Sequence, residues 1–349
     1  MNKLKLVGLS ALAGSLAMTS ANAVDYVLAG DAAMGYTGES ANTSTGNGDG
    51  FALDTSLYFD AAGSLDNGWD VSFSMDFDNE SGTVSATSTQ GAITMGSMGK
   101  IQINQIGGSA ANAIDDVMPS AYEEAYGMGG LADGTGGNVG GDAGFFGSST
   151  NSGSIQYTAP ALETAGATIT ASIGMDPSAN VGANSFGAAS GGETGMFYTL
   201  KVAHESGLEI GAGLEEVDTN GNIGTAAGRE AKDEESVTVY AKYAFGPLSV
   251  GIQESYQDTL DGAADYEANM WGLAYTAGDV SVSYGETETI TKGLAATAER
   301  TTDADAIAIS YSMGSMTIQA QKSEQARSVA GTGGSTTLDE TGIKVSFAF

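Results

Sequence analysis

Most of the chain is built from short segments in which apolar and polar residues alternate. An alternation with period two predicts β-strands, because successive side chains leave opposite faces of the backbone. The clearest case runs from Phe51 to Asp78, where two such segments meet at a turn around Asn67-Gly68. Aromatic and aliphatic residues occupy one phase of these segments, and carboxylates recur on the other. The carboxylates are Asp54, Asp60, Asp70, Asp76 and Asp78.

About sixteen segments of this kind follow one another along the chain, and the segment at 83–95 has the weakest pattern. The predicted strands are 24–37, 51–62, 68–78, 83–95, 100–106, 154–160, 167–175, 194–204, 208–217, 235–245, 248–257, 267–276, 280–289, 304–312, 316–323 and 339–349.

The connections alternate between short turns and long loops rich in Gly, Asn, Asp and Thr, and the longest is 107–153. Such a meander has two unlike rims, which is typical of transmembrane barrels. We therefore predict an all-β protein, a transmembrane antiparallel up-and-down β-barrel of about 16 strands forming one domain over 24–349. A secreted β-sandwich would satisfy the same alternation with its polar face in bulk water, but it explains the unlike rims less well.

The first 23 residues have the three regions of a secretory signal peptide. Lys3 and Lys5 give the positive start, 6–18 the apolar stretch, and Ala23 ends a small-residue cleavage site before Val24. We expect export through the Sec pathway.

Composition narrows the function further. The formal charge of the 349-residue chain is −31, which argues against nucleic acid as a partner because phosphates require Lys and Arg. Cysteine is absent, so disulfides and thiolate chemistry are excluded. His204 is the only histidine, and its phase directs it outward at a strand end. A catalytic site is therefore not expected, and the prediction is that the protein is not an enzyme.

The segments resemble the general-diffusion porins of Rhodobacter-type bacteria, a family of Gram-negative outer-membrane proteins. The matching stretches are 30–35 (GDAAMG) in the first strand, the hairpin 57–71, 99–101 (GKI) and the closing 342–349 (GIKVSFAF). The resemblance implies a 16-stranded barrel, a homotrimer, contact with outer-membrane lipid and lipopolysaccharide, and a long third outer loop folded into the pore. Phe347 and Phe349 resemble the terminal signal that the barrel assembly machinery reads.

The resemblance also implies that the loop 107–153 forms the constriction. Its acidic residues Asp115, Asp116, Glu123 and Glu124 are then expected to edge the pore, whereas a solvated surface loop is the alternative interpretation.

The wall opposite this loop departs from the family. The positions that carry arginine in the family are Ala33, Asp54 and Ser56 here. Arg229, Arg300 and Arg327 are all predicted in outer loops. The polar phase of the strands carries acidic Asp31, Asp54, Asp60, Asp70, Asp76 and Asp78 and basic Lys100, Lys201, Lys242 and Lys344.

Charged side chains that line a narrow pore select ions by sign. We therefore expect a passive, cation-preferring channel for small hydrophilic solutes. Two alternatives remain open at this stage: a substrate-specific outer-membrane channel, and an acidic calcium-binding surface or adhesin protein. No cofactor is required, although carboxylates crowded into loops are ligands of the kind that Ca²⁺ and Mg²⁺ prefer. Solvated Gly-rich turns explain the same loops.

Overall fold

The computed structural model describes residues 24–41, 48–80, 83–114, 117–125, 153–179, 193–218, 233–258, 265–292, 299–329 and 335–349. The predicted signal peptide 1–23, with its cleavage residue Ala23, lies outside the described residues. Asp115, Asp116 and the larger part of the loop 107–153 also lie outside them, while Val24 begins the first strand.

The described residues form seventeen strands and two short 3₁₀ helices. The strands are β1 Val24–Ala41, β2 Gly48–Ser64, β3 Asp70–Glu80, β4 Thr83–Thr94, β5 Lys100–Ile106, β6 Ser154–Thr158, β7 Leu162–Thr164, β8 Ala167–Ala179, β9 Glu193–His204, β10 Leu208–Asp218, β11 Glu234–Phe245, β12 Leu248–Asp258, β13 Asp265–Ala277, β14 Val280–Lys292, β15 Arg300–Met313, β16 Met316–Val329 and β17 Ser335–Ala348. The 3₁₀ helices are η1 Gly96–Met98 and η2 Asn112–Ile114.

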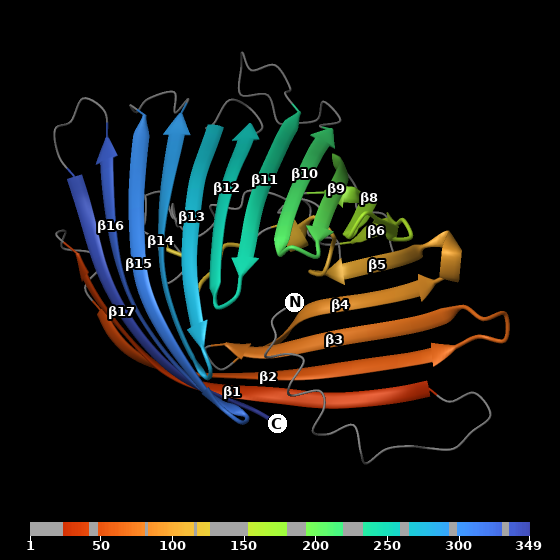
Figure 1. Ribbon diagram of the computed structural model, residues 1–349, viewed down its shortest axis with the longest axis horizontal. Helices are drawn as coiled ribbons and strands as arrows, with labels where there is room; N and C mark the ends of the chain where they lie inside the picture. The colour runs from red at the N-terminus through yellow and green to blue at the C-terminus, as the bar shows by residue number, and fades with distance from the viewer. Residues whose placement is uncertain are drawn as a thin grey trace.

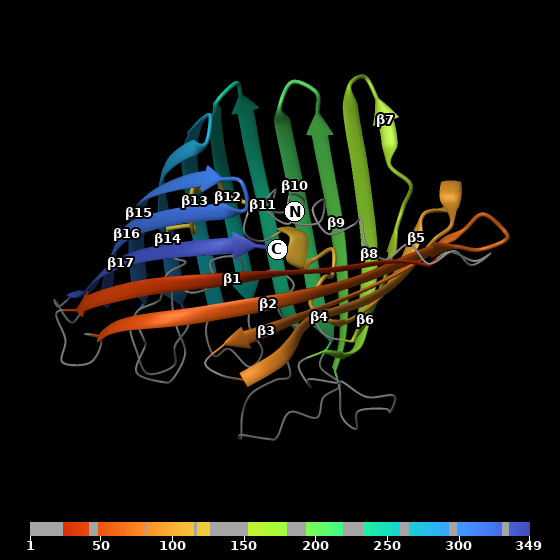
Figure 2. The same ribbon diagram turned by 90° about the horizontal axis from the view of Figure 1, so that it is seen from below.

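Each strand pairs antiparallel with its neighbours in the chain, and β1 pairs with both β2 and β17, which closes the sheet. Because β6 and β7 both pair with β8, they share one position, so the seventeen strands make a 16-strand barrel. This confirms the predicted fold class. Figure 1 shows β10–β16 side by side along one wall, and Figure 2 shows β1–β4 crossing beneath.

The predicted strands all occur, but many extend further toward the long loops than the alternation indicates. β16, for example, continues to Val329 rather than 323. The reason is that charged residues occupy both phases there, so the apolar pattern fades while the hydrogen-bonded ladder continues. Two details were missed: residues 162–164 form a strand and not a turn, and only residues 81–82 separate β3 from β4 on the long-loop side.

The two faces of the wall differ sharply in exposure. Large apolar side chains are exposed on the outward face, including Ile252 and Ile307 at 60% each, whereas inward polar residues such as Thr238 are fully buried. Phe347 and Phe349 share the outward phase, and Gly30 and Phe349 exchange two backbone hydrogen bonds of 2.8 and 2.9 Å. No helix in the described ranges is long and apolar enough to cross a membrane.

Charge divides the outward face into two regions. On β1–β6, Asp49 is the only acidic or basic residue at a described outward position. On β12–β17, outward positions are apolar near the short turns and then become charged toward the long loops. These charged residues include Glu254, Glu267, Glu286, Asp305, Lys322, Glu324 and Asp339.

Candidate functional site: the lining of the barrel

Carboxylates concentrate on the inward face of three adjacent strands. The strand register places Asp31 of β1 opposite Ser56 of β2, and Ser56 opposite Asp78 of β3. Tyr58, one inward position further along β2, donates a 2.5 Å hydrogen bond to Asp31. The remaining predicted acidic residues share this face because the pairing keeps their phase. They are Asp54, Asp60, Asp70 and Asp76. We call β1–β3 the acidic wall.

Two of the predicted basic residues neutralise an acidic residue that the sequence reasoning missed. Lys201 and Lys242 each place Nζ 3.0 Å from Oε1 of Glu209, on the three neighbouring strands β9, β10 and β11. The hydroxyl of Tyr240 donates to the same oxygen at 2.9 Å. Glu209 alternates with outward Leu208 and Ile210, so its phase in the sequence identifies it as inward.

The other two lysines lie apart from that cluster. Lys100 donates from Nζ to Oε1 of Gln102 at 2.7 Å. Lys344 lies over the ring of Tyr122, with Nζ 5.1 Å from the ring centroid, which is within the range of a cation–π contact. The four lysines are therefore spread over several strands and do not form one basic cluster.

The prediction for the arginines was wrong for two of the three. Arg300 and Arg327 lie within β15 and β16 and not in outer loops, because these strands run further than their alternation indicates. Arg327 is buried, and its Nε donates to Oγ1 of Thr302 at 3.4 Å. Arg229 is outside the described residues.

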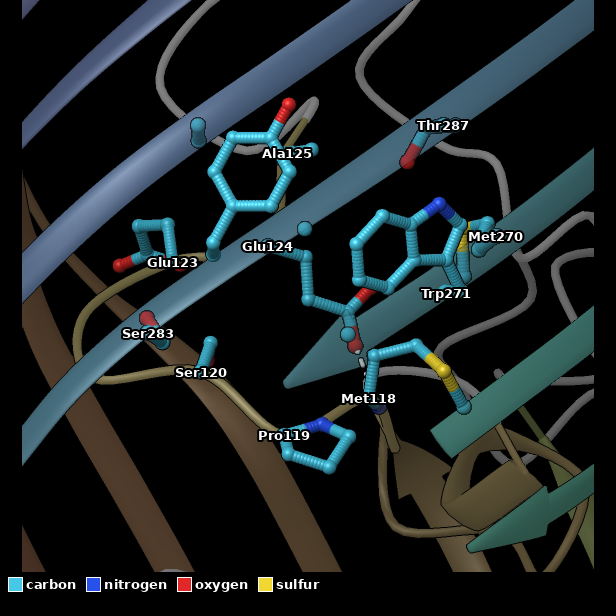
Figure 3. Close-up of a pocket in the computed structure, with 14 residues that line it drawn as sticks. Met118, Pro119, Ser120, Glu123, Glu124, Ala125, Met270, Trp271, Ser283 and Thr287 are labelled. Carbon is cyan, nitrogen blue, oxygen red and sulfur yellow. Dashed lines mark hydrogen bonds between the residues drawn. The ribbon is translucent and has the colours of Figure 1, made fainter. Parts of the chain in front are cut away.

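Residues 117–125, a described part of the loop that follows β5, lie against β13–β15 (Figure 3). The backbone N–H of Ala121 donates to Oγ of Ser283 at 2.8 Å, and that of Glu123 donates to Oε1 of Gln321 at 2.9 Å. The amide groups of Gln319 and Gln321 donate in turn to the carbonyls of residues 121 and 124. We call residues 117–125 the inner segment.

Glu123 and Glu124 are placed differently on the inner segment. Glu123 is exposed, whereas Glu124 is half-buried and accepts a 2.7 Å hydrogen bond from the N–H of Met118. That bond closes the inner segment on itself, which is a structural role the sequence did not indicate. Tyr122 precedes these two glutamates in the inner segment. Burial of its side chain, together with the charge of the neighbouring Glu123, raises the pKa of Tyr122.

A second acidic pair lies toward the long loops and was also missed. Glu39 of β1 is the register partner of Glu340 of β17, and Glu340 is 1% exposed. Its Oε2 accepts from Ser323 at 3.4 Å and from Gln325 at 3.2 Å. Glu340 follows Asp339, so carboxylates on both phases obscure the alternation there, and Glu39 lies beyond residue 37, where the first predicted strand ends.

Within the described ranges, no group of three or more His, Asp or Glu side chains is arranged to hold a metal ion. His204 ends β9, and its ring nitrogens contact Oγ of Ser206 and the carbonyl of Ala165 at the short-turn rim. This position agrees with an outward residue at the edge of the wall.

Comparison with known proteins identifies the family. The sequence model of a family described as Gram-negative porin matches residues 8–321. This chain belongs to the Gram-negative porin family. The match confirms the predicted resemblance. A porin is a diffusion channel of the Gram-negative outer membrane. No curated protein matches the sequence.

Several solved structures share the fold at low identity. OmpT of Vibrio cholerae, in a form lacking loop L8, has a TM-score of 0.65 at 13% identity, with 95% of this chain and 100% of that chain covered. OmpF of Salmonella typhi in complex with daunomycin gives 0.61 at 12%, covering 94% and 98%. A mutant porin of Rh. blastica gives 0.54 at 14%, covering 93% and 100%.

Proposed function

We propose that this porin is a passive channel through which small hydrophilic solutes and ions diffuse. The observation that carries the proposal is a closed barrel in which nearly every strand carries polar or charged side chains on its inward face, with family membership behind it. The inner segment is the constriction in this proposal, because its hydrogen bonds attach it to inward side chains of β14 and β16. It therefore takes space within the barrel cross-section.

The test is conductance in a planar bilayer combined with swelling of proteoliposomes in sugars of increasing size. A general channel gives ohmic current steps and a swelling rate that falls smoothly with solute size. A substrate-specific channel, the main alternative, gives a current that one solute class blocks with saturation. An acidic surface protein gives neither current nor swelling, and that result would overturn the proposal.

We further propose that the channel prefers cations. The acidic wall supports this, because its six predicted carboxylates share one face while two of the four predicted lysines are paired with Glu209. Low-dielectric walls concentrate the field of such charges in the lumen. Conductance in lithium chloride and in potassium acetate, each compared with potassium chloride, tests this preference. Lithium is a slower cation than potassium and acetate is a slower anion than chloride. In a cation-preferring channel, the change to lithium should reduce the current more than the change to acetate.

For assembly, we propose a homotrimer in the outer membrane, as in the trimeric form described for Vibrio cholerae OmpT. The outward face of β1–β6 suits the protein contact, since it carries a single charged residue among its described positions. The outward positions of β12–β17 near the short turns are apolar and suit the acyl chains of outer-membrane lipid and lipopolysaccharide. Export through the Sec pathway after cleavage at Ala23–Val24, and recognition of Phe347 and Phe349 by the barrel assembly machinery, complete the proposal.

Divalent cations are a minor part of the proposal. Ca²⁺ or Mg²⁺ would bind the acidic loops through oxygen ligands and would not be needed for conduction. Nucleic acid is not a partner, because the strong negative charge of the chain repels phosphate.

A further inference from the structure

Three glycines form a row across neighbouring strands on the inward face. Gly251 of β12 is the register partner of Gly272 of β13, and Gly272 is the partner of Gly285 of β14. Ala306 of β15 continues the row as the partner of Gly285. Glycine weakens the interior of a strand and often marks a place where another backbone approaches closely. The next inward positions toward the long loops carry larger side chains: Gln253, Met270 and Thr287.

The inner segment fills the space that these glycines leave. A Cβ atom added to Gly251 would lie 2.7 Å from Cδ of Pro119 and 3.1 Å from Sδ of Met118. One added to Gly272 would lie 2.9 Å from the carbonyl oxygen of Pro119. Real Cβ atoms essentially never come closer than 3.0 Å to such neighbours. A side chain at either position would therefore displace the segment.

The inner segment packs closely against the glycine row, with little empty space between them. The cavity between the inner segment and β13–β15 has a volume of about 20 Å³, which is room for about one water molecule. Met118 is 7% exposed and belongs to an apolar cluster with Phe197, Tyr240 and Met270. The start of the inner segment is therefore held by close apolar packing, whereas its later residues are held by hydrogen bonds to Ser283 and Gln321.

We propose that Gly251 and Gly272 are positioning residues of this channel, which form a seat for Met118 and Pro119 and thereby set how far the inner segment projects into the lumen. The effect on pore width rests on the proposed function. The seat itself is a contact between two parts of the chain and can be measured without any current. A side chain at Gly272 lifts the segment from the wall, which loosens it and narrows the open path.

The absence of cysteine makes a site-specific probe straightforward. Ser120 is exposed, so Ser120→Cys can carry a nitroxide spin label whose spectrum reports the mobility of the inner segment. The label is compared in the otherwise native protein, in Gly272→Ala and in Gly272→Val. The matched control is Gly50→Val, at an inward position of β2 where an added Cβ meets nothing within 4 Å.

Label mobility should rise from native to Gly272→Ala to Gly272→Val, and Gly50→Val should match the native spectrum. Single-channel conductance should fall in the same order. Identical spectra in all four proteins would overturn the seat, as would an equal change in Gly50→Val. If Gly272→Val fails to give a heat-modifiable barrel, the comparison of Gly272→Ala with the native protein and with Gly50→Val tests the seat. A native protein that passes no current while the spectra follow the expected order would refute the channel and leave the seat intact.

Discussion

The acidic wall β1–β3 and the opposite wall β12–β15 are built from the same alternating strands, yet they use their inward positions in opposite ways. The first presents carboxylates such as Asp31, Asp54 and Asp76. The second presents glycine, alanine and serine, which receive the inner segment together with Gln321 of the adjoining strand β16. The outward faces are reversed: the charged belt lies outside β12–β17, and β1–β6 are nearly uncharged. Period two fixes which residues share a face, and the residue type decides whether that face borders water, lipid or another part of the chain.

Removing charge from the acidic wall should have the largest effect. A variant combining Asp31→Asn, Asp54→Asn and Asp76→Asn should lower the ratio of cation to anion permeability by about an order of magnitude at low salt. A unit charge about 7 Å from an ion contributes about 0.6 kcal/mol even at the dielectric constant of water, and three are removed. The control Asp49→Asn removes the outward carboxylate of β2 and should leave the ratio unchanged. An equal response in the control would contradict the comparison.

Glu209→Gln should act in the same direction with a smaller magnitude. The substitution leaves Lys201 and Lys242 without their shared carboxylate, so the inward face of β9–β11 gains positive character and the permeability ratio falls by about twofold to threefold. Thermal stability should change by less than about 1 kcal/mol, because both ion pairs are partly exposed. Glu267→Gln, which removes the outward partner of Lys292, is the control. A ratio as unchanged as in the control would show that the two lysines do not border the ion path.

Loosening the inner segment should affect current noise more than selectivity. Ser283→Ala with Gln321→Ala removes hydrogen bonds to residues 121, 123 and 124, at about 1 kcal/mol each. Open-channel noise should increase while the barrel melts as before. Ser281→Ala, on the same strand with its partner Thr276 near the short turns, serves as the control. Quiet recordings from the double variant would mean that packing and the remaining hydrogen bond from Gln319 suffice to hold the inner segment.

Chelation should have the smallest effect. Conductance of the purified protein should be unchanged after treatment with EDTA, because the described residues hold no group of three acidic or histidine side chains set for a metal ion. A loss of current that Ca²⁺ or Mg²⁺ restores would place a required cation in the acidic loops.

The sequence was sufficient for the fold where burial and exposure alternate cleanly. β2 and β3 are examples, since their polar phase lies on the inward face of the barrel and their apolar phase lies on the outward face. It was insufficient at the long-loop ends, where Glu324 and Arg327 put charge on both phases of β16 and so hid the last residues of the strand. The alternation of Glu209 with Leu208 and Ile210 could have predicted its inward position from the sequence.

Contacts between distant parts of the chain could not be predicted from the sequence. Gly251 and Gly272 look like ordinary strand glycines until the register aligns them. The hydrogen bond from Met118 to Glu124 likewise depends on how the loop turns back, which no periodicity encodes. The edge roles expected for Asp115 and Asp116 stay predictions.

The most direct measurement is the zero-current potential of the native channel in a planar bilayer with a tenfold gradient of potassium chloride. If the acidic wall borders the ion path, potassium crosses faster than chloride and the dilute side becomes positive, increasingly so as the total salt concentration is lowered and screening weakens. A dilute side that becomes negative would contradict the account, because chloride would then be the preferred ion despite the carboxylates of β1–β3.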